Sequence, residues 1–226
     1  MMIPDASDAR VFLGEGGANA PVIYVVDSPE HPFDVAPLAY GRRATLASVP
    51  VASWNDALTP WPAPGIYREE APFGGQAAQT LASLVEEAIP AIEAQAELAP
   101  TTRAICGYSL GGLFSLYALT HSDAFAACAC LSGSLWYEGW AEHLAGLDVD
   151  LAGRFAHLSL GTKERKAARP ILKTVQDQTE QCVAILQRKG CQVEYRTGPG
   201  NHMQHIPERF DAGLSALDAF LAPREA

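Results

Sequence analysis

Short apolar runs alternate with longer amphipathic segments along most of this chain, and this alternation limits the possible folds more than any other feature. Each apolar run is bounded by glycine, proline or polar residues, as buried strands are. Such strands are expected at residues 21–26, 46–53, 102–106, 125–131, 155–160 and 191–196. Helical segments between strands allow the long crossovers that parallel strands require. The pattern therefore predicts an α/β fold with a mostly parallel central sheet and helices on both faces.

Helical periodicity and helix-breaking residues set the remaining expectations. A short helix is expected at 33–43, and longer ones at 75–97, 110–121, 170–189 and 206–221. Pro90 should kink or split the second of these helices, and Gly190 suits the position just after the fourth. Prolines at 60, 62, 64 and 72 predict that residues 54–72 form a loop.

Length and charge narrow the class of protein. The 226 residues suit a single domain spanning 1–226, and 16 basic against 26 acidic residues give a net charge of −10. That charge repels phosphate backbones and anionic lipid headgroups, so we expect neither nucleic acid nor membrane as a partner. No stretch approaches the roughly 20 apolar residues of a membrane span, and residues 1–12 lack a secretory pattern. Five scattered cysteines suggest reduced, buried thiols, so a cytoplasmic location is expected.

A possible nucleophile lies between a predicted strand and a predicted helix. Gly107, Tyr108, Ser109, Leu110 and Gly111 match G-x-S-x-G in the strand–turn–helix context of a nucleophile elbow. Glycines on both sides allow the tight turn that lifts the Ser109 hydroxyl. The Leu110 N–H would then point toward an oxyanion forming beside Ser109.

A serine hydroxyl needs a base and an orienting carboxylate, and both types follow later strands. Glu164 comes after the strand at 155–160, and His202 lies in a Gly/Pro-rich loop after the strand at 191–196. This order, Ser then acid then His, is that of α/β-hydrolases. Asp177 is the main rival to Glu164, but it falls within a helix. His202 and His205 form an H-x-x-H pair without a third ligand pattern, so no metal is expected.

At these residues the chain resembles the putative-esterase branch of the α/β-hydrolase superfamily, which includes enterochelin esterases and S-formylglutathione hydrolase. The similarity runs from Val22 onward and rests on four stretches: CGYSLGGLF at 106–114, LSGSLW at 131–136, SLGTKE at 159–164 and PGNH at 199–202. It implies an α/β-hydrolase fold, ester hydrolysis through an acyl-serine intermediate with a Ser-Glu-His triad, and no cofactor.

The chain departs from that family after its first long strand. Many relatives have a His-Gly pair there, next to the second oxyanion donor, where this chain has Val-Asp-Ser-Pro at 26–29. The Ser28 N–H is our expected second donor, and the Trp54–Asn55 segment is its rival. The short stretch between the strands at 125–131 and 155–160 leaves no room for a large lid.

Aromatic and polar side chains near the motifs are candidates for the substrate pocket. We expect Tyr108, Trp54, Asn55 and Trp136 to line it, and packing is the competing explanation for the tryptophans. Tyr137, Trp140 and Trp61 are further candidates, and packing is the competing explanation for them too.

The sequence thus predicts a serine esterase acting on a small-molecule ester, with a homodimer left open as its oligomeric form. An acyltransferase or a peptidase would use the same triad, because the fold alone does not determine the acceptor. A binding module that kept the scaffold but lost catalysis is the alternative from outside the enzymes.

Overall fold

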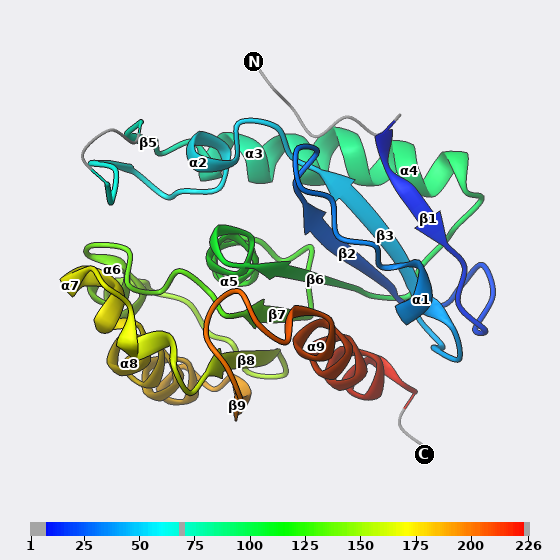
Figure 1. Cartoon of the computed structure of the whole chain (residues 1–226). Coiled ribbons are helices and arrows are strands. Elements are labelled where there is room, and N and C mark those ends of the chain that lie inside the picture. Colours follow the sequence, from blue (N-terminus) through cyan, green and yellow to red (C-terminus); the bar gives the residue numbers. More distant parts are fainter. Residues whose placement is uncertain (1–7, 68–70, 224–226) are drawn as a thin grey trace.

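The computed structural model describes residues 8–67 and 71–223. Its main sheet has seven strands in the order β1-β3-β2-β6-β7-β8-β9 (Figure 1). The strands are β1 (Arg10–Phe12), β2 (Val22–Asp27), β3 (Thr45–Pro50), β6 (Arg103–Tyr108), β7 (Ala127–Leu131), β8 (Phe155–Gly161) and β9 (Gln192–Gly198). Only β1 among these pairs antiparallel, with β3, and each of the others runs parallel to its neighbours. The prediction of a mostly parallel sheet is confirmed.

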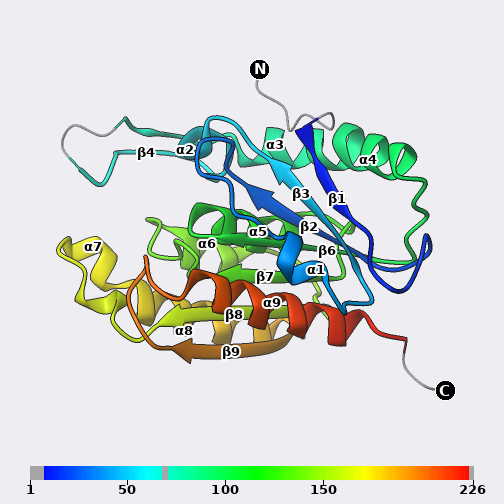
Figure 2. The same ribbon diagram turned by 45° about the vertical axis from the view of Figure 1, so that its right-hand side comes forward.

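Helices cover both faces of this sheet, and each face has its own apolar core (Figure 2). One core packs α1 (Ala36–Ala39) and α9 (Ile206–Leu221) against residues such as Ile23 and Ala129. The other core holds the remaining long helices, packed on residues such as Tyr24 and Cys128. Those helices are α3 (Ala77–Ser83), α4 (Ile89–Gln95), α5 (Leu110–His121), α6 (Trp140–Gly146) and α8 (Val175–Arg188).

Strand residues that alternate along the chain therefore reach different cores, which explains why the strands are apolar on both sides. In β2, every residue is buried. Val22, Tyr24 and Val26 face one core, while Ile23 and Val25 face the other. A strand covered on both faces shows a continuous apolar run rather than a polar alternation.

Two local expectations differ from the structure. The segment 54–72 is not all loop, because α2 (Trp54–Ala57) forms one helical turn there, with Asp56 and Ala57 N–H groups donating to the Ser53 carbonyl. The short strands β4 (Pro62–Ala63) and β5 (Phe73–Gly74) pair beyond it. Pro90 does not split its helix: a π-helical turn, η2 (Leu84–Ala88), precedes it and the helix continues as α4. The wider π-helical turn accommodates the proline, which has no N–H to donate to the preceding turn.

The strands β6 and β7 end in register, as do β8 and β9, and all four end at one edge of the sheet. Tyr108 pairs with Leu131, and Gly161 pairs with Gly198. Ligands of parallel sheets bind beyond this carboxyl edge. Between β7 and β8 the chain carries α6 and short connections, with no inserted subdomain. Within the two described ranges, no helix is both long and apolar enough to cross a bilayer.

Candidate active site

Ser109 sits on a sharp turn between β6 and α5. Its φ of 58° and ψ of −120° fall in a region that L-residues rarely occupy. The turn is possible because Gly107 has no side chain: a Cβ there would lie 2.3 Å from the Gly111 carbonyl oxygen. Leu110 is the first residue of α5, so its N–H has no carbonyl one turn earlier to bind. This geometry holds the Ser109 hydroxyl above the sheet edge, beside a helix N-terminus.

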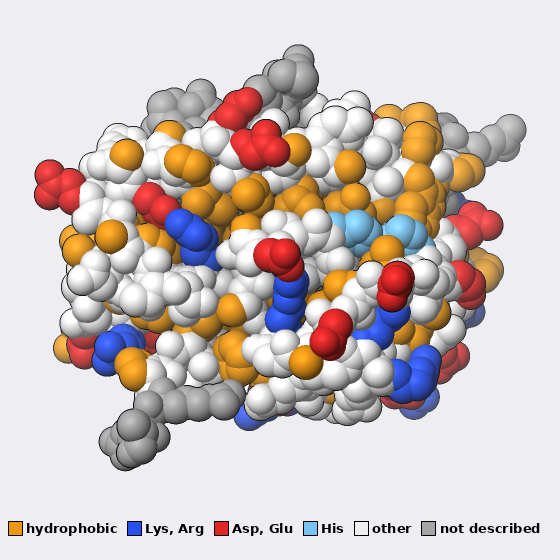
Figure 3. All heavy atoms as spheres, turned by 180° about the vertical axis from the view of Figure 1, so that it is seen from behind, with side chains coloured by type: hydrophobic (Ala, Val, Ile, Leu, Met, Phe, Trp, Pro, Cys, Tyr) orange, Lys and Arg blue, Asp and Glu red, His pale blue; other side chains and the backbone are white. Residues whose placement is uncertain are grey.

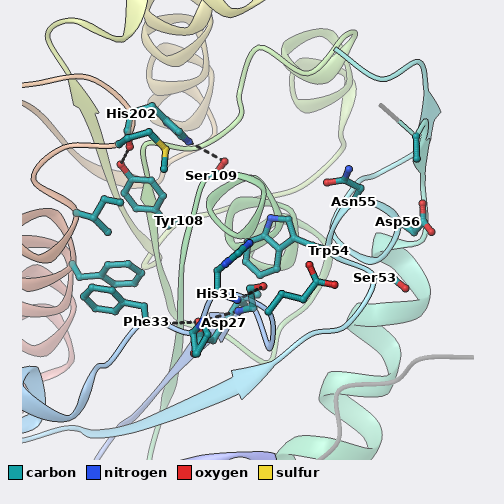
Figure 4. Close-up of a pocket in the computed structure, with 18 of the residues that line it drawn as sticks. Asp27, His31, Phe33, Ser53, Trp54, Asn55, Asp56, Tyr108, Ser109 and His202 are labelled. Carbon is teal, nitrogen blue, oxygen red and sulfur yellow. Dashed lines mark hydrogen bonds between the residues drawn. The ribbon is translucent and has the colours of Figure 1, made fainter. Parts of the chain in front are cut away.

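The structure brings the three predicted triad residues together. His202 Nε2 lies 3.1 Å from Ser109 Oγ, and His202 Nδ1 lies 2.9 Å from Glu164 Oε2 (Figure 4). The residues are separated by 93 and 38 positions in the sequence. A carboxylate can only accept at Nδ1, so Nδ1 carries the proton and Nε2 is free to accept one from Ser109.

Glu164 is held as a buried carboxylate. It begins a short 3-10 turn, η3 (Glu164–Lys166), after β8 and is 6% exposed. Burial by itself raises the pKa of this carboxyl, but hydrogen bonds from His202, Gly161 N–H and Ser132 outweigh it and hold the pKa below its usual value. Glu164 therefore stays ionised at neutral pH. Asp177, its rival in the sequence, lies exposed on α8.

Two serines after β7 support the site, and sequence reasoning gave them no role. Ser132 has a φ of 42° and donates its hydroxyl to Glu164 Oε1 at 2.8 Å. The Ser134 N–H donates to the Ser109 carbonyl, and its hydroxyl lies 3.4 Å from Ser109 Oγ. In the sequence, Ser132 and Ser134 belong to the LSGSLW stretch that carries the family resemblance, and they directly follow a strand. These two features were the only indication that the serines lie near the site.

Arg209 is a second residue that the sequence analysis missed. It lies on α9, is 5% exposed, and approaches Glu164 Oε1 to 3.5 Å. One guanidinium nitrogen donates to Tyr108 Oη at 2.6 Å and to Ser132 Oγ at 3.0 Å. The other donates to the carbonyls of Pro199 and Asn201. Arg209 thus ties the triad acid to the loop that carries His202.

Tyr108 completes this attachment of the histidine loop. Its hydroxyl donates to the His202 carbonyl at 2.6 Å while it accepts from Arg209. Its ring also packs near the His202 imidazole, with centroids 5.2 Å apart. Tyr108 was expected to line the substrate pocket; the structure places it at the wall of the cavity beside Ser109, where it also anchors the loop.

A cavity of about 640 Å³ opens beside Ser109 and His202. Of the residues expected in the substrate pocket, Tyr108, Trp54 and Asn55 line this cavity (Figure 4). Trp136 does not: it lies with Tyr137 and Phe73 at a separate, smaller cavity, so that expectation is corrected. Trp140 is fully buried and belongs to the core. The rings of Trp136 and Tyr137 pack against Phe73, and Trp61 packs against Tyr137 and Trp140.

The expectation for Ser28 also needs correction. Its N–H donates to Asp27 Oδ1 at 2.9 Å, so this group is already engaged and is not directed at an oxyanion. Asp27 Oδ1 also accepts the Phe33 N–H, which closes the loop after β2 on its own carboxylate. The Leu110 N–H stays the predicted oxyanion donor, and Asn55, from the rival Trp54–Asn55 segment, lines the cavity.

Another histidine pair lies away from this cavity. His121 Nε2 and His143 Nε2 are 3.1 Å apart, and Tyr117 stacks on His121. Neighbouring histidine side chains lie at the surface beside apolar ones on the face opposite to that of Figure 1 (Figure 3). Burial lowers the pKa of both His121 and His143. Across the described residues, no group of three His, Cys, Asp or Glu side chains could hold a metal ion.

Comparisons with known proteins give matches in family and in fold. A family model described as "Putative esterase" matches residues 10–205. The uncharacterized protein YbbA of Bacillus subtilis is 34% identical over 140 residues, which cover 60% of this chain and 55% of that protein. The matched segment thus spans about half the length of that curated relative.

Solved structures show the same fold. An IroE-like serine hydrolase from Shewanella oneidensis superposes with a TM-score of 0.77 at 19% identity, over 96% of this chain and 77% of its own. The siderophore hydrolase EstA of Aspergillus nidulans gives a TM-score of 0.71 at 17% identity, over 98% of this chain and 94% of its own. The sheet order, the crossovers and these likenesses identify the fold as that of the α/β-hydrolases.

Proposed function

The chain belongs to the putative esterase family, and on that basis we propose that it is an enzyme that hydrolyses carboxylic esters. The observation that carries the proposal is the continuous hydrogen-bonded series from Ser109 through His202 to Glu164 at the mouth of a cavity. A nucleophile, a base and an orienting acid in this order are what acyl transfer from an ester requires.

In the proposed mechanism, His202 Nε2 takes the proton of Ser109 as Oγ attacks the ester carbonyl. The Leu110 N–H stabilises the negative charge on the carbonyl oxygen. Protonated His202 then gives its proton to the departing alcohol, which leaves an acyl-serine. Water attacks this intermediate with His202 again as base, and the acid is released. Glu164 stabilises the imidazolium in both steps.

The test is hydrolysis of p-nitrophenyl esters of increasing acyl length by wild type, Ser109→Ala and Glu164→Gln. We expect Ser109→Ala to lose more than about 10³-fold in kcat/KM, as loss of a triad member does in serine hydrolases. Glu164→Gln should lose less but still strongly. The matched control is Glu180→Gln, an exposed residue of α8, which should retain wild-type turnover. Full activity in Ser109→Ala would refute the assignment.

Two other activities share the site, and each has its own assay. An acyltransferase would form a new ester when an alcohol acceptor is added, whereas a hydrolase releases free acid. A peptidase would cleave amide substrates at comparable rates. A non-catalytic binding module would fail to react with a fluorophosphonate, because an unactivated serine is a poor nucleophile.

A further inference from the structure

The cavity beside Ser109 carries unbalanced negative charge. Asp27, Glu30 and Asp56 line it, and no lysine or arginine is present among its described lining residues. Asp27 is buried, pairs with Arg10 at 3.3 Å and accepts two backbone N–H groups, so the fold itself balances its charge. Glu30 is exposed and Asp56 is partly exposed. Within the described ranges, neither carboxylate takes part in an ion pair or a hydrogen bond. Both carboxylates therefore line the cavity without a charged partner among the described residues, and that of Asp56 lies close to Gly74 of β5.

Aromatic rings form the walls between these carboxylates and the nucleophile. Trp54 lies against the start of α5, since a Cβ on Gly111 would come within 3.1 Å of its indole. On the opposite wall, Phe33 stacks on Phe210 at 4.1 Å between centroids, and Tyr108 follows at 5.9 Å. Figure 4 shows Trp54 between His31 and Asn55, with Ser109 and Tyr108 facing it.

Aromatic faces next to carboxylates bind one chemical class particularly well. A quaternary ammonium is attracted to the ring quadrupole of tryptophan or tyrosine and loses little hydration when it is buried. An anionic substrate would meet repulsion from Glu30 and Asp56, with no cation in the described lining to offset it. The net charge of −10 adds a long-range attraction for cations.

We propose that this site selects esters that carry a fixed positive charge, with Glu30 and Asp56 as specificity-determining residues and Trp54 as the aromatic contact. The inference rests on the proposed ester hydrolysis and names the substrate class of the same site. A partly exposed carboxylate contributes little by itself. Two carboxylates together with a cation–π contact favour the cationic ester roughly tenfold in kcat/KM over a neutral ester of the same shape.

The experiment compares two pairs of isosteric esters, in which a trimethylammonium group replaces a tert-butyl group. One pair carries it on the alcohol: butyrylcholine against 3,3-dimethylbutyl butyrate. The other carries it on the acyl chain of a p-nitrophenyl ester. For each pair, the cationic-to-neutral ratio of kcat/KM is measured at about 20 mM and about 500 mM salt, because salt screens exposed charges. The ratio is then measured in Glu30→Gln, Asp56→Asn and the double variant, with Glu86→Gln, an exposed residue outside the cavity, as the matched control.

We expect a ratio near ten in at least one pair, a decrease at high salt, and a further decrease in the double variant but not in Glu86→Gln. Neutral esters hydrolysed as well as or better than cationic ones in both pairs would overturn the selectivity and leave the ester hydrolase intact. A high ratio that persists in a folded double variant would overturn the role of these carboxylates. If that variant does not fold, the salt dependence of the wild type decides instead. No hydrolysis of any ester, together with no fluorophosphonate labelling, would refute the proposed function itself.

Discussion

Replacing Ser109 with glycine should make this protein more stable than replacing it with alanine. The reason is its backbone, with a φ of 58° and a ψ of −120°. A non-glycine residue held in such a region costs about 1–3 kcal/mol, whereas glycine adopts it freely. Glycine also loses more conformational freedom on folding, which offsets about 0.4–1 kcal/mol of that gain.

The expected difference is therefore about 0.5–2 kcal/mol in favour of Ser109→Gly over Ser109→Ala. Both variants lose the hydroxyl and its hydrogen bond to His202, so this loss cancels in the comparison. Urea unfolding followed by circular dichroism measures the two free energies of unfolding. Ala91→Gly, at an exposed helical position of α4, supplies the control and should be destabilised by about 0.5–1 kcal/mol. A Ser109→Gly variant no more stable than Ser109→Ala would show that the elbow is not strained.

Three further predictions concern charge. Arg209→Met should lower the free energy of unfolding by about 3–5 kcal/mol, because it leaves Glu164 without its buried cation. Arg209→Lys should recover only part of this loss, and urea titration of both variants measures it. Because the pKa of Glu164 is held low, its contribution to the free energy of unfolding is present above about pH 4.3 and is lost as the pH falls below it. The difference in free energy of unfolding between wild type and Glu164→Gln should therefore narrow in acid. Burial lowers the pKa of His121 and His143, so their contribution to the free energy of unfolding is fully present above about pH 6.5 and is lost as the pH falls below it. Urea unfolding across this pH range should show a weaker decrease for His143→Gln than for wild type.

The parts of the fold that the sequence predicts well are those decided by local patterns. The β-branched run that forms β2 and the strand–turn–helix context of Ser109 each lie within a few neighbouring residues. Glu164 and His202 could be located because they follow strands whose order in the sheet fixes where their ends lie. The structure brings both side chains to Ser109, and their catalytic roles stay predictions.

The parts that the sequence did not reveal depend on contacts between distant segments. Arg209 meets Tyr108 across 101 positions, and nothing near either residue indicates the contact. Trp136 was expected in the substrate pocket because it is an aromatic residue near the motifs, but it packs against Phe73 and Tyr137 and lines a different cavity from Ser109. The helical turn at Trp54–Ala57 is held by backbone hydrogen bonds to the Ser53 carbonyl, and Ser53 has a positive φ. The prolines nearby indicated a loop and gave no sign of this turn.

The attachment of the His202 loop to α9 has a consequence for protein synthesis. Arg209 lies beyond His202 in the chain, and it binds the carbonyls of Pro199 and Asn201, which directly precede His202 in the loop. A nascent chain that has left the ribosome only as far as His202 already contains Ser109 and Glu164, but it lacks Arg209, which lies in α9. If the proposed triad is correct, we therefore expect a nascent chain to hydrolyse esters only after the first turn of α9 has left the ribosome, when all strands of the sheet have already been made.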